Sequence, residues 1–224
     1  MSNSSQYLEM SNKLAVKICG MKEAENILEI ASLNPEYLGF IFAKKSPRYF
    51  EGVIPVLPKQ IQKVGVFVDE TVAVISELVE LHQLQAVQLH GNESFQFCEI
   101  LKEQLHSDIK IIKVFSVGED FDFEALKPFE DVADYFLLDT KGKFPGGNGT
   151  QFDWQILENY TSKKPFFLSG GIGVEEVGAI QQLRKMNLPL YAIDCNSKLE
   201  ISPGIKNKKQ CEELLENFAD KNKH

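Results

Sequence analysis

Cysteine is scarce in this 224-residue sequence, and its four cysteines lie far apart. They form no CxxC pair, so their spacing supports neither a zinc knuckle nor a compact disulfide framework. The sequence also has no cluster of His, Cys and Asp with metal-ligand spacing, and no GxGxxG, GxxxxGKS or GxxxxGKT loop for a nucleotide. We therefore expect reduced thiols, no metal ion and no nucleotide cofactor.

Positive charge is in short supply as well, because 24 lysines and arginines stand against 32 aspartates and glutamates, for a net charge of −8. Nucleic-acid and anionic membrane surfaces need an excess of basic residues, so the sequence predicts neither kind of partner. The first thirteen residues are polar and hold no apolar stretch long enough for a secretory signal, and the apolar runs elsewhere are strand-sized. We expect a soluble, cytoplasmic protein that holds any anionic ligand in a local site.

Eight short apolar runs, rich in residues that favour strands, recur along the whole chain. Near-continuous apolar runs are typical of strands that are buried on both faces, as parallel sheets require. The runs are LAVKI from Leu14, YLGFIF from Tyr37, VGVFV from Val64, LQAVQL from Leu84, IKIIKVF from Ile109, DYFLL from Asp134, PFFL from Pro165 and LYAI from Leu190.

Segments with the period of a helix lie between these runs, most clearly over 71–81 and 92–105. Regular strand–helix units suit right-handed crossovers and leave no separate second domain. We predict an α/β fold, a single (β/α)8 barrel with parallel strands over 14–224, preceded by a polar extension over 1–13, with helices following the strands throughout. An open doubly wound sheet is the alternative fold.

Three loops rich in glycine and polar residues follow the last three predicted strands, over 143–151, 169–173 and 194–204. In a barrel these loops share the carboxyl end, where the loops after strands seven and eight often bind phosphate. Gly170 and Gly171 would let backbone N–H groups approach an anion before a helix that opens at Val174, although a tight turn without a ligand would need the same glycines. Asn196 and Ser197 would complete the phosphate site.

Cys19 and Asp139 end the first and sixth predicted strands, so a closed barrel would present both side chains at its mouth. A carboxylate after a long apolar run is partly desolvated, which makes Asp139 a candidate general acid; a helix cap or loop anchor is the plain alternative. A free cysteine is more often inert than catalytic, and Cys19 would need a local positive field to form a thiolate. We assign no chemistry to Cys98, Cys195 or Cys211.

Arg48 and His90 are the remaining candidates for contact with a ligand. The Arg48 guanidinium, in the loop after the second strand, would pair with a substrate carboxylate through two parallel hydrogen bonds. A solvated basic loop is the competing interpretation. His90 ends the fourth strand and is either a ligand contact or a structural histidine.

The ordered motifs resemble one known family. They are KICG, GFIF followed by KKSPR, VGVFV, VQLHG, LLDT, GGNG with FDW, LSGGI, and DCNSKLE with SPG. In this order and spacing the chain resembles the phosphoribosylanthranilate isomerases of tryptophan biosynthesis, from about Leu14 to the C-terminal helix. SGGI alone occurs across phosphate-binding barrels, but the ordered set is specific.

The resemblance implies an Amadori rearrangement of N-(5-phosphoribosyl)anthranilate to 1-(2-carboxyphenylamino)-1-deoxyribulose 5-phosphate, with no cofactor. It implies that Asp139 is the general acid that opens the sugar ring and that Cys19 is the base that removes the C2 proton. The other implied substrate-binding residues are Arg48 for the anthranilate carboxylate, Gly170, Gly171, Asn196 and Ser197 for the phosphate, and Asp194, the aspartate that opens the eighth-strand motif. We expect a monomer or a homodimer.

The sequence departs from the family pattern in both phosphate loops. GGNG over 146–149 stands where the family usually has GGTG, and Asn196, Ser197 and Lys198 stand where it usually has two serines and a glycine. Asparagine keeps a donor and tolerates left-handed backbone geometry, so we expect phosphate binding to survive.

Other phosphate-binding barrels are the nearest alternatives. A histidine-pathway sugar isomerase would have an aspartate in place of Cys19, and indoleglycerol-phosphate synthase or the tryptophan synthase α chain would need a catalytic lysine or glutamate constellation that we do not find. A catalytically silent barrel used for binding would need neither Cys19 nor Asp139.

Overall fold

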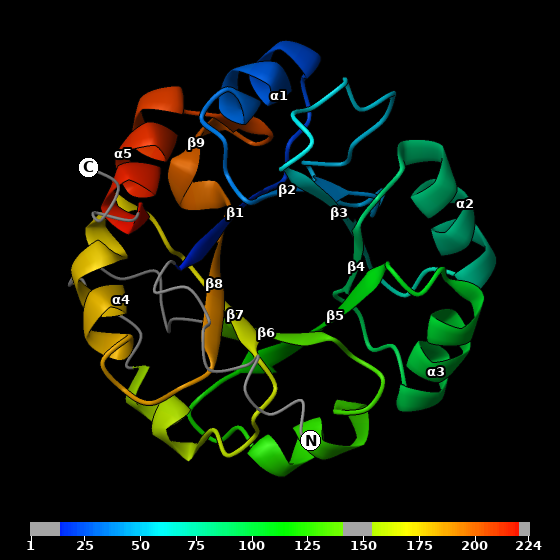
Figure 1. Cartoon of the computed structure of the whole chain (residues 1–224), viewed down its shortest axis with the longest axis vertical. Helices are drawn as coiled ribbons and strands as arrows, with labels where there is room; N and C mark the ends of the chain where they lie inside the picture. Colours follow the sequence, from blue (N-terminus) through cyan, green and yellow to red (C-terminus); the bar gives the residue numbers. More distant parts are fainter. Residues whose placement is uncertain (1–13, 141–153, 220–224) are drawn as a thin grey trace, which may run out of the picture.

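The computed structural model describes residues 14–140 and 154–219 of the chain. The predicted extension over 1–13 and the GGNG loop lie outside these residues. Within the described part, eight parallel strands close into a barrel, and each strand pairs with its neighbours in chain order until β8 returns to β1 (Figure 1). The strands are β1 (Ala15–Cys19), β2 (Tyr37–Ile41), β3 (Gln62–Phe67), β4 (Ala86–Leu89), β5 (Lys110–Val117), β6 (Tyr135–Thr140), β7 (Phe166–Ser169) and β8 (Leu190–Cys195).

This arrangement confirms the predicted barrel and all eight predicted strands. Their apolar runs are continuous because the inward face of each strand fills the barrel while the outward face packs under the surrounding layer. A short antiparallel pair, β9 (Glu200–Ser202) and β10 (Ile205–Lys206), follows β8 outside the barrel.

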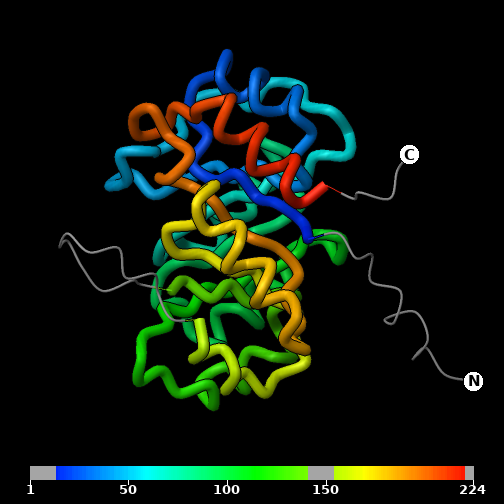
Figure 2. Tube along the Cα trace, turned by 90° about the vertical axis from the view of Figure 1, so that its left-hand side faces the viewer, coloured from blue at the N-terminus to red at the C-terminus, as the bar shows by residue number. Residues whose placement is uncertain are grey.

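Helices surround the barrel, but they are unevenly distributed. The α-helices are α1 (Ala24–Ala31), α2 (Val72–His82), α3 (Phe95–Gln104), α4 (Val177–Leu183) and α5 (Lys208–Phe218), and the 3-10 helices are η2 (Phe123–Phe129), η3 (Trp154–Asn159), η4 (Val174–Glu176) and η5 (Ser197–Leu199). The predicted helices over 71–81 and 92–105 are confirmed as α2 and α3, whose side-chain N-caps are Thr71 and Ser94. In Figure 2 the last helix, α5, lies beside α1, so the two ends of the barrel chain pack together.

The prediction that a helix follows every strand is wrong between β2 and β3, where residues 42–61 form turns and extended chain. Pro55 and Pro58 lack the N–H that a helix interior needs, and Gly52 has a φ of +126°. Aromatic packing replaces the helix, because the buried Phe50 ring lies edge-on to Phe40 with centroids 5.2 Å apart. Between β5 and β6 the chain forms the 3-10 helix η2, which contains Pro128.

Side chains inside the barrel form layers, because every second residue of a strand points inward. The lower layers are apolar and are formed by Ala15, Tyr37, Val64, Ala86, Ile112, Val114, Leu137, Phe167 and Ala192. Two residues further along five of these strands, the same face carries the polar residues Lys17, Gln88, Asp139, Ser169 and Asp194. The barrel interior therefore changes from apolar to polar toward the carboxyl ends of its strands.

Candidate active site

A cavity of about 210 Å³ opens above this polar layer, at the carboxyl ends of the strands. Its lining residues are Cys19, Ile41, Val66, Gln88, His90, Asp139, Ser169, Gly170, Gly171, Ile172, Asp194, Asn196, Ser197 and Lys198. Of the nine residues predicted for the site, eight line this cavity, and Arg48 does not. The eight were predicted from five strand ends scattered over the chain, and closure of the barrel brings them together.

The Cys19 thiol is almost fully buried in the cavity wall, with 4% of the residue exposed. It fits there because Gly39 on β2 has no side chain, and a Cβ atom on Gly39 would lie 2.7 Å from Cys19 Sγ. Burial raises the pKa of the thiol, Lys17 lowers it and Asp194 raises it, with a net shift upward. The thiol is thus buried in the cavity wall, and Lys17 is the cation with the largest effect on its pKa.

That cation, Lys17, is a residue that the sequence analysis missed. It is fully buried, and its Nζ donates to Asp194 Oδ1 at 2.9 Å. Burial lowers the pKa of Lys17, but Asp194 and Cys19 raise it more, so the ammonium form is favoured. Period-two alternation could have found it, since Lys17 and Cys19 are two residues apart and must share the inner face of β1. Lys17 is one source of the positive field that a Cys19 thiolate would need, and it offsets part of the effect of burial on the pKa of the thiol.

Asp139 faces the cavity from β6, and 21% of its side chain is exposed. Its Oδ2 lies 3.8 Å from Nε2 of His90, whose Nδ1 is 3.3 Å from Gln88 Nε2. Because the Gln88 Nε2 group can only donate, His90 Nδ1 accepts in this contact, and a neutral His90 then carries its proton on Nε2, toward Asp139. The His90 side chain is 38% exposed, so it lies beside the carboxyl group at the open side of the cavity.

The turn after β7, for which the sequence predicted phosphate binding, has backbone geometry that requires glycine. Gly170 and Gly171 have φ angles of +114° and +68°, which favour glycine, and a Cβ atom on Gly170 would overlap the Thr140 carbonyl oxygen. The chain then enters η4, whose start is capped by the Glu176 carboxylate accepting from the Gly173 N–H at 2.8 Å. Successive glycines before a helix leave backbone N–H groups free to face an anion.

The loop after β8 packs directly against this turn. A Cβ atom on Gly173 would lie 2.9 Å from Cβ of Lys198, so the two predicted phosphate loops are in contact. The Lys198 ammonium lies 3.6 Å from a Glu176 oxygen and 3.7 Å from a Glu175 oxygen, and its side chain is 47% exposed. Lys198 therefore lies where the two predicted phosphate loops meet, with two glutamates opposing its charge.

Arg48 lies at the rim of the cavity rather than in its wall. Its Nε and Nη2 donate to the carboxylate of Glu200 at distances of 2.6–3.0 Å, and Nη1 has no partner among the described residues. Gly20 makes room for this arginine, since a Cβ atom there would lie 2.8 Å from Arg48 Cδ and 2.7 Å from Asn196 Oδ1. Two interpretations of Arg48 were open, a guanidinium free to pair with a substrate carboxylate and a solvated basic loop. The structure matches neither fully, because Glu200 already binds one side of the guanidinium.

Glu200 was not predicted as a site residue, and it joins two cations. It accepts from Lys206 Nζ at 2.8 Å as well as from Arg48, and Lys206 also donates to Asn196 Oδ1 at 2.8 Å. Burial raises the pKa of the Glu200 carboxyl, but hydrogen bonds from Arg48 and Lys206 lower it more, and its pKa is about 2. The pairing fixes the rim of the cavity in one geometry.

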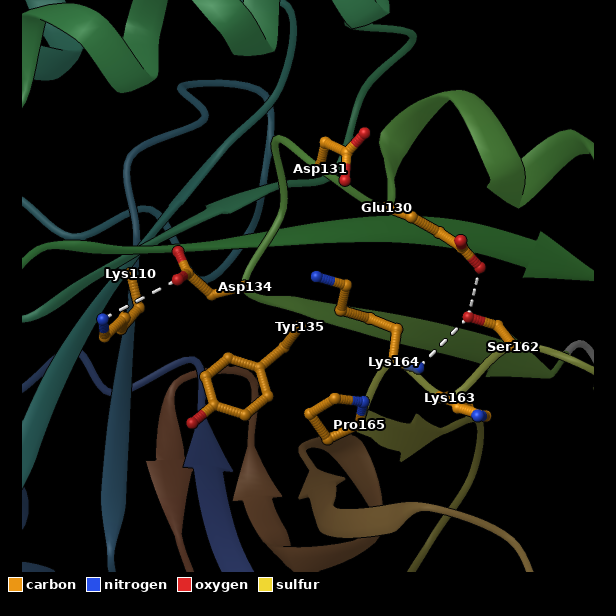
Figure 3. Close-up of a pocket in the computed structure, with 9 residues that line it drawn as sticks. All are labelled: Lys110, Glu130, Asp131, Asp134, Tyr135, Ser162, Lys163, Lys164 and Pro165. Carbon is orange, nitrogen blue, oxygen red and sulfur yellow. Dashed lines mark hydrogen bonds and ion pairs between the residues drawn. The ribbon is translucent and has the colours of Figure 1, made fainter. Parts of the chain in front are cut away.

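Two larger cavities lie away from this site. One of about 510 Å³ surrounds the starts of β5, β6 and β7 (Figure 3), where Lys110 pairs with Asp134 and the Ser162 hydroxyl donates to Glu130. The other, of about 660 Å³, lies between the 53–61 segment and the end of α2. Residues at the amino ends of barrel strands generally serve stability, so neither cavity is a better candidate.

Within 14–140 and 154–219, no group of three or more His, Cys, Asp or Glu side chains is placed to hold a metal ion. In the same residues no helix is long and apolar enough to cross a membrane.

A closed parallel (β/α)8 barrel whose cavity at the carboxyl ends of the strands is lined by a carboxyl group, a thiol and a glycine turn has the arrangement of a barrel enzyme. Comparisons with known proteins identify the particular family. The family model for N-(5'-phosphoribosyl)anthranilate isomerase matches residues 16–217. The chain belongs to this family.

The similar proteins agree with this identification. The isomerase of Parabacteroides distasonis is 40% identical over 203 residues, which cover 86% of this chain and 88% of that protein. Among solved structures, the isomerase of Thermotoga maritima has a TM-score of 0.78 at 30% identity, and an isomerase in complex with reduced 1-(o-carboxyphenylamino)-1-deoxyribulose 5-phosphate has a TM-score of 0.76 at 29% identity. Each alignment covers 92% of this chain and 98% of the other. This chain is an isomerase acting on phosphoribosylanthranilate in tryptophan biosynthesis.

Proposed function

We propose that this isomerase rearranges its substrate by general acid–base catalysis, with Asp139 as the acid and Cys19 as the base. The observation that carries the proposal is that a carboxyl group on β6 and a thiol on β1 line one cavity together with the Gly170–Gly171 turn. A phosphate held by that turn would place the sugar between the two groups. Only proton transfers are required, so the proposed reaction needs no cofactor.

The first step is the opening of the ribose ring. Asp139 donates its proton to the ring oxygen while the bond from that oxygen to C1 breaks. The lone pair of the anthranilate nitrogen forms a C=N bond to C1, which gives a cationic Schiff base. Asp139 is left as a carboxylate, and the solvent-exposed His90 beside it offers a route for a new proton.

The second step is removal of the proton from C2. The positive nitrogen acidifies the neighbouring C–H bond, so a thiolate of modest basicity suffices. Cys19 takes the proton, the C–H electrons form a C1=C2 double bond, and the electrons of the C=N bond return to nitrogen as its lone pair. The resulting enolamine tautomerises to the ketone as C1 gains a proton and the C2 hydroxyl loses one. Lys17 favours the thiolate because a cation beside it offsets part of the cost of burying a negative charge.

Two anchors would hold the substrate at its ends. Backbone N–H groups of Gly170 and Gly171, with Asn196 and Ser197, would bind the phosphate, and Lys198 adds charge there. The free Nη1 side of Arg48 would receive the anthranilate carboxylate, with Glu200 keeping the guanidinium in place. Asp194 is proposed to contact the substrate from the cavity floor, through the carboxylate oxygen that Lys17 does not occupy. From the sequence we also propose that the protein is a monomer or a homodimer and that it is cytoplasmic.

The proposed reaction can be tested by following the fluorescence of phosphoribosylanthranilate as purified protein consumes it. We expect conversion of this substrate and none of the histidine-pathway aminoaldose, whose isomerase type uses an aspartate in place of Cys19. Arg48→Ala should raise KM about 10- to 100-fold with a smaller change in kcat, because the carboxylate contact is present in both the bound substrate and the transition state. Lys45→Ala, an exposed charge in the same loop, is the matched control. An unchanged KM for Arg48→Ala would contradict the carboxylate contact.

A further inference from the structure

Gln88 is a polar residue of the cavity that neither the sequence analysis nor the proposed mechanism uses. It is the third residue of β4 and follows Ala86 on the inner face of the barrel. Only 1% of the residue is exposed, yet it lines the cavity together with Cys19 and Asp139. A buried primary amide has four hydrogen-bonding positions, so its partners can be counted.

The count leaves one end of the amide unsatisfied. Gln88 Nε2 contacts His90 Nδ1 at 3.3 Å, whereas Oε1 is buried and has no hydrogen-bond partner among the described residues. Exchange of the two amide atoms would leave an N–H group unpaired in place of the oxygen, so one polar end is unpaired in either orientation. An unpaired buried polar group costs free energy, and one that lines a cavity is positioned to pair with a ligand or a bound water there.

The ligand group that suits this position must be small, and it must be able either to donate to the amide oxygen or to accept from the amide N–H. A hydroxyl group both donates and accepts, and the substrate of the proposed reaction carries hydroxyls on the sugar carbons next to the reacting bonds. A phosphate or carboxylate oxygen would only accept, and the Gly170–Gly171 turn and Arg48 already provide for those groups. The contact with His90 also links the amide to Asp139, 3.8 Å beyond the imidazole.

We propose that Gln88 binds a hydroxyl of the sugar and thereby positions the ring for proton transfer, an inference that rests on the proposed function. Gln88 is then a specificity residue, because a ligand without that hydroxyl leaves the amide unpaired in the complex just as it is in the free protein. A site built to pair with a hydroxyl discriminates strongly against the deoxy compound.

The test is calorimetric binding of the reduced product analogue, 1-(2-carboxyphenylamino)-1-deoxyribitol 5-phosphate, to wild type and Gln88→Leu. We expect Gln88→Leu to bind about 10- to 100-fold more weakly, since an unmet hydroxyl is buried in its complex. Its melting temperature should equal or exceed that of wild type, because the substitution removes an unpaired group from the free protein. Gln104→Leu, on the exposed face of α3, is the control and should change neither quantity.

Deoxy analogues then distinguish a hydroxyl contact from a loss of shape. One analogue lacking a single sugar hydroxyl should bind wild type more weakly than the complete analogue does. That same deoxy analogue should bind wild type and Gln88→Leu with equal affinity. If Gln88→Leu lowers the melting temperature, Gln88→Met, which keeps the length of the chain, replaces it in the same cycle. If Gln88→Leu loses affinity equally for every analogue relative to wild type, or loses none, the proposed role of Gln88 is wrong. Failure of wild type to consume phosphoribosylanthranilate overturns the proposed function instead, and the two failures are read from separate measurements.

Discussion

The ammonium group of Lys17 lies 2.9 Å from Asp194 Oδ1, across the seam where β1 and β8 close the barrel. The two residues are direct neighbours in the strand register, and both are almost fully buried. A buried ion pair is seldom kept for stability alone, since apolar residues of similar size often stabilise a core as well. Lys17 precedes Cys19 by two residues on β1, and the two members of the pair act on the thiol in opposite directions, since Lys17 lowers its pKa and Asp194 raises it.

Lys17→Met should slow the reaction of Cys19 with iodoacetamide. Lys17 lowers the pKa of this thiol, so its removal raises that pKa and reduces the thiolate fraction, roughly tenfold for each pKa unit. Alkylation at Cys19 would be read by peptide mass spectrometry near neutral pH. Lys113→Met, which breaks another buried pair, with Glu93, is the matched control.

Removing Lys17 alone leaves Asp194 buried without its partner, at an expected cost of about 3–5 kcal/mol in the free energy of unfolding. The double variant Lys17→Met/Asp194→Asn avoids that cost. Asp194→Asn alone should speed the alkylation of Cys19, because the Asp194 carboxylate raises the pKa of the thiol. Equal alkylation rates in wild type, Lys17→Met and Asp194→Asn would show that the pair does not act on Cys19.

Glu200 should make stability depend on pH in the acid range. Its pKa of about 2 in the folded protein is below the ordinary value of 4.5, so the folded state is stabilised at pH values above 4.5 and loses this contribution as the pH falls toward 2. Glu200→Gln should therefore be less stable than wild type in urea at pH 7, and the difference should shrink between about pH 5 and pH 2. Glu99→Gln, on the exposed side of α3, controls for the loss of a charge. A difference that stays constant over this range would contradict the pairing with Arg48 and Lys206.

The two glycines of the β7 turn should respond differently to alanine. Gly171 has open space where a Cβ atom would lie, so Gly171→Ala should cost about 1–2 kcal/mol through its positive φ alone. Gly170→Ala should cost clearly more, because the new methyl group overlaps the Thr140 backbone, which cannot rotate away as a side chain can. Urea unfolding of both variants measures this, and equal costs would mean that the turn adopts another geometry.

The strands were predictable because a parallel barrel buries both faces of each strand, which leaves an apolar run in the sequence. The absence of a helix after β2 was not predicted, because a helix was expected after every strand, whereas the helical period of clear segments such as 71–81 does not extend to the segment that contains Pro55 and Pro58. The prolines and glycine of that segment indicate the absence of a helix, and this signal was present in the sequence.

The residues at strand ends were found because their position in the motif fixes their place in a barrel. Glu200 was missed because its partner Arg48 is 152 residues away in the chain, and no local pattern reports such a contact. Lys17 and Gln88 were missed because a polar residue inside an apolar run was counted as part of the strand. In a barrel the inner face near the carboxyl ends is where such residues meet a ligand.

The central claim is that Asp139 and Cys19 transfer the protons, and kcat of Cys19→Ala and Asp139→Asn tests it most directly. Each variant should lose at least about 10²-fold in kcat while binding the reduced product analogue within about threefold of wild type, because each removes one proton-transfer group and leaves both anchors in place. Near-normal kcat in either variant, with the analogue still bound, would contradict the account.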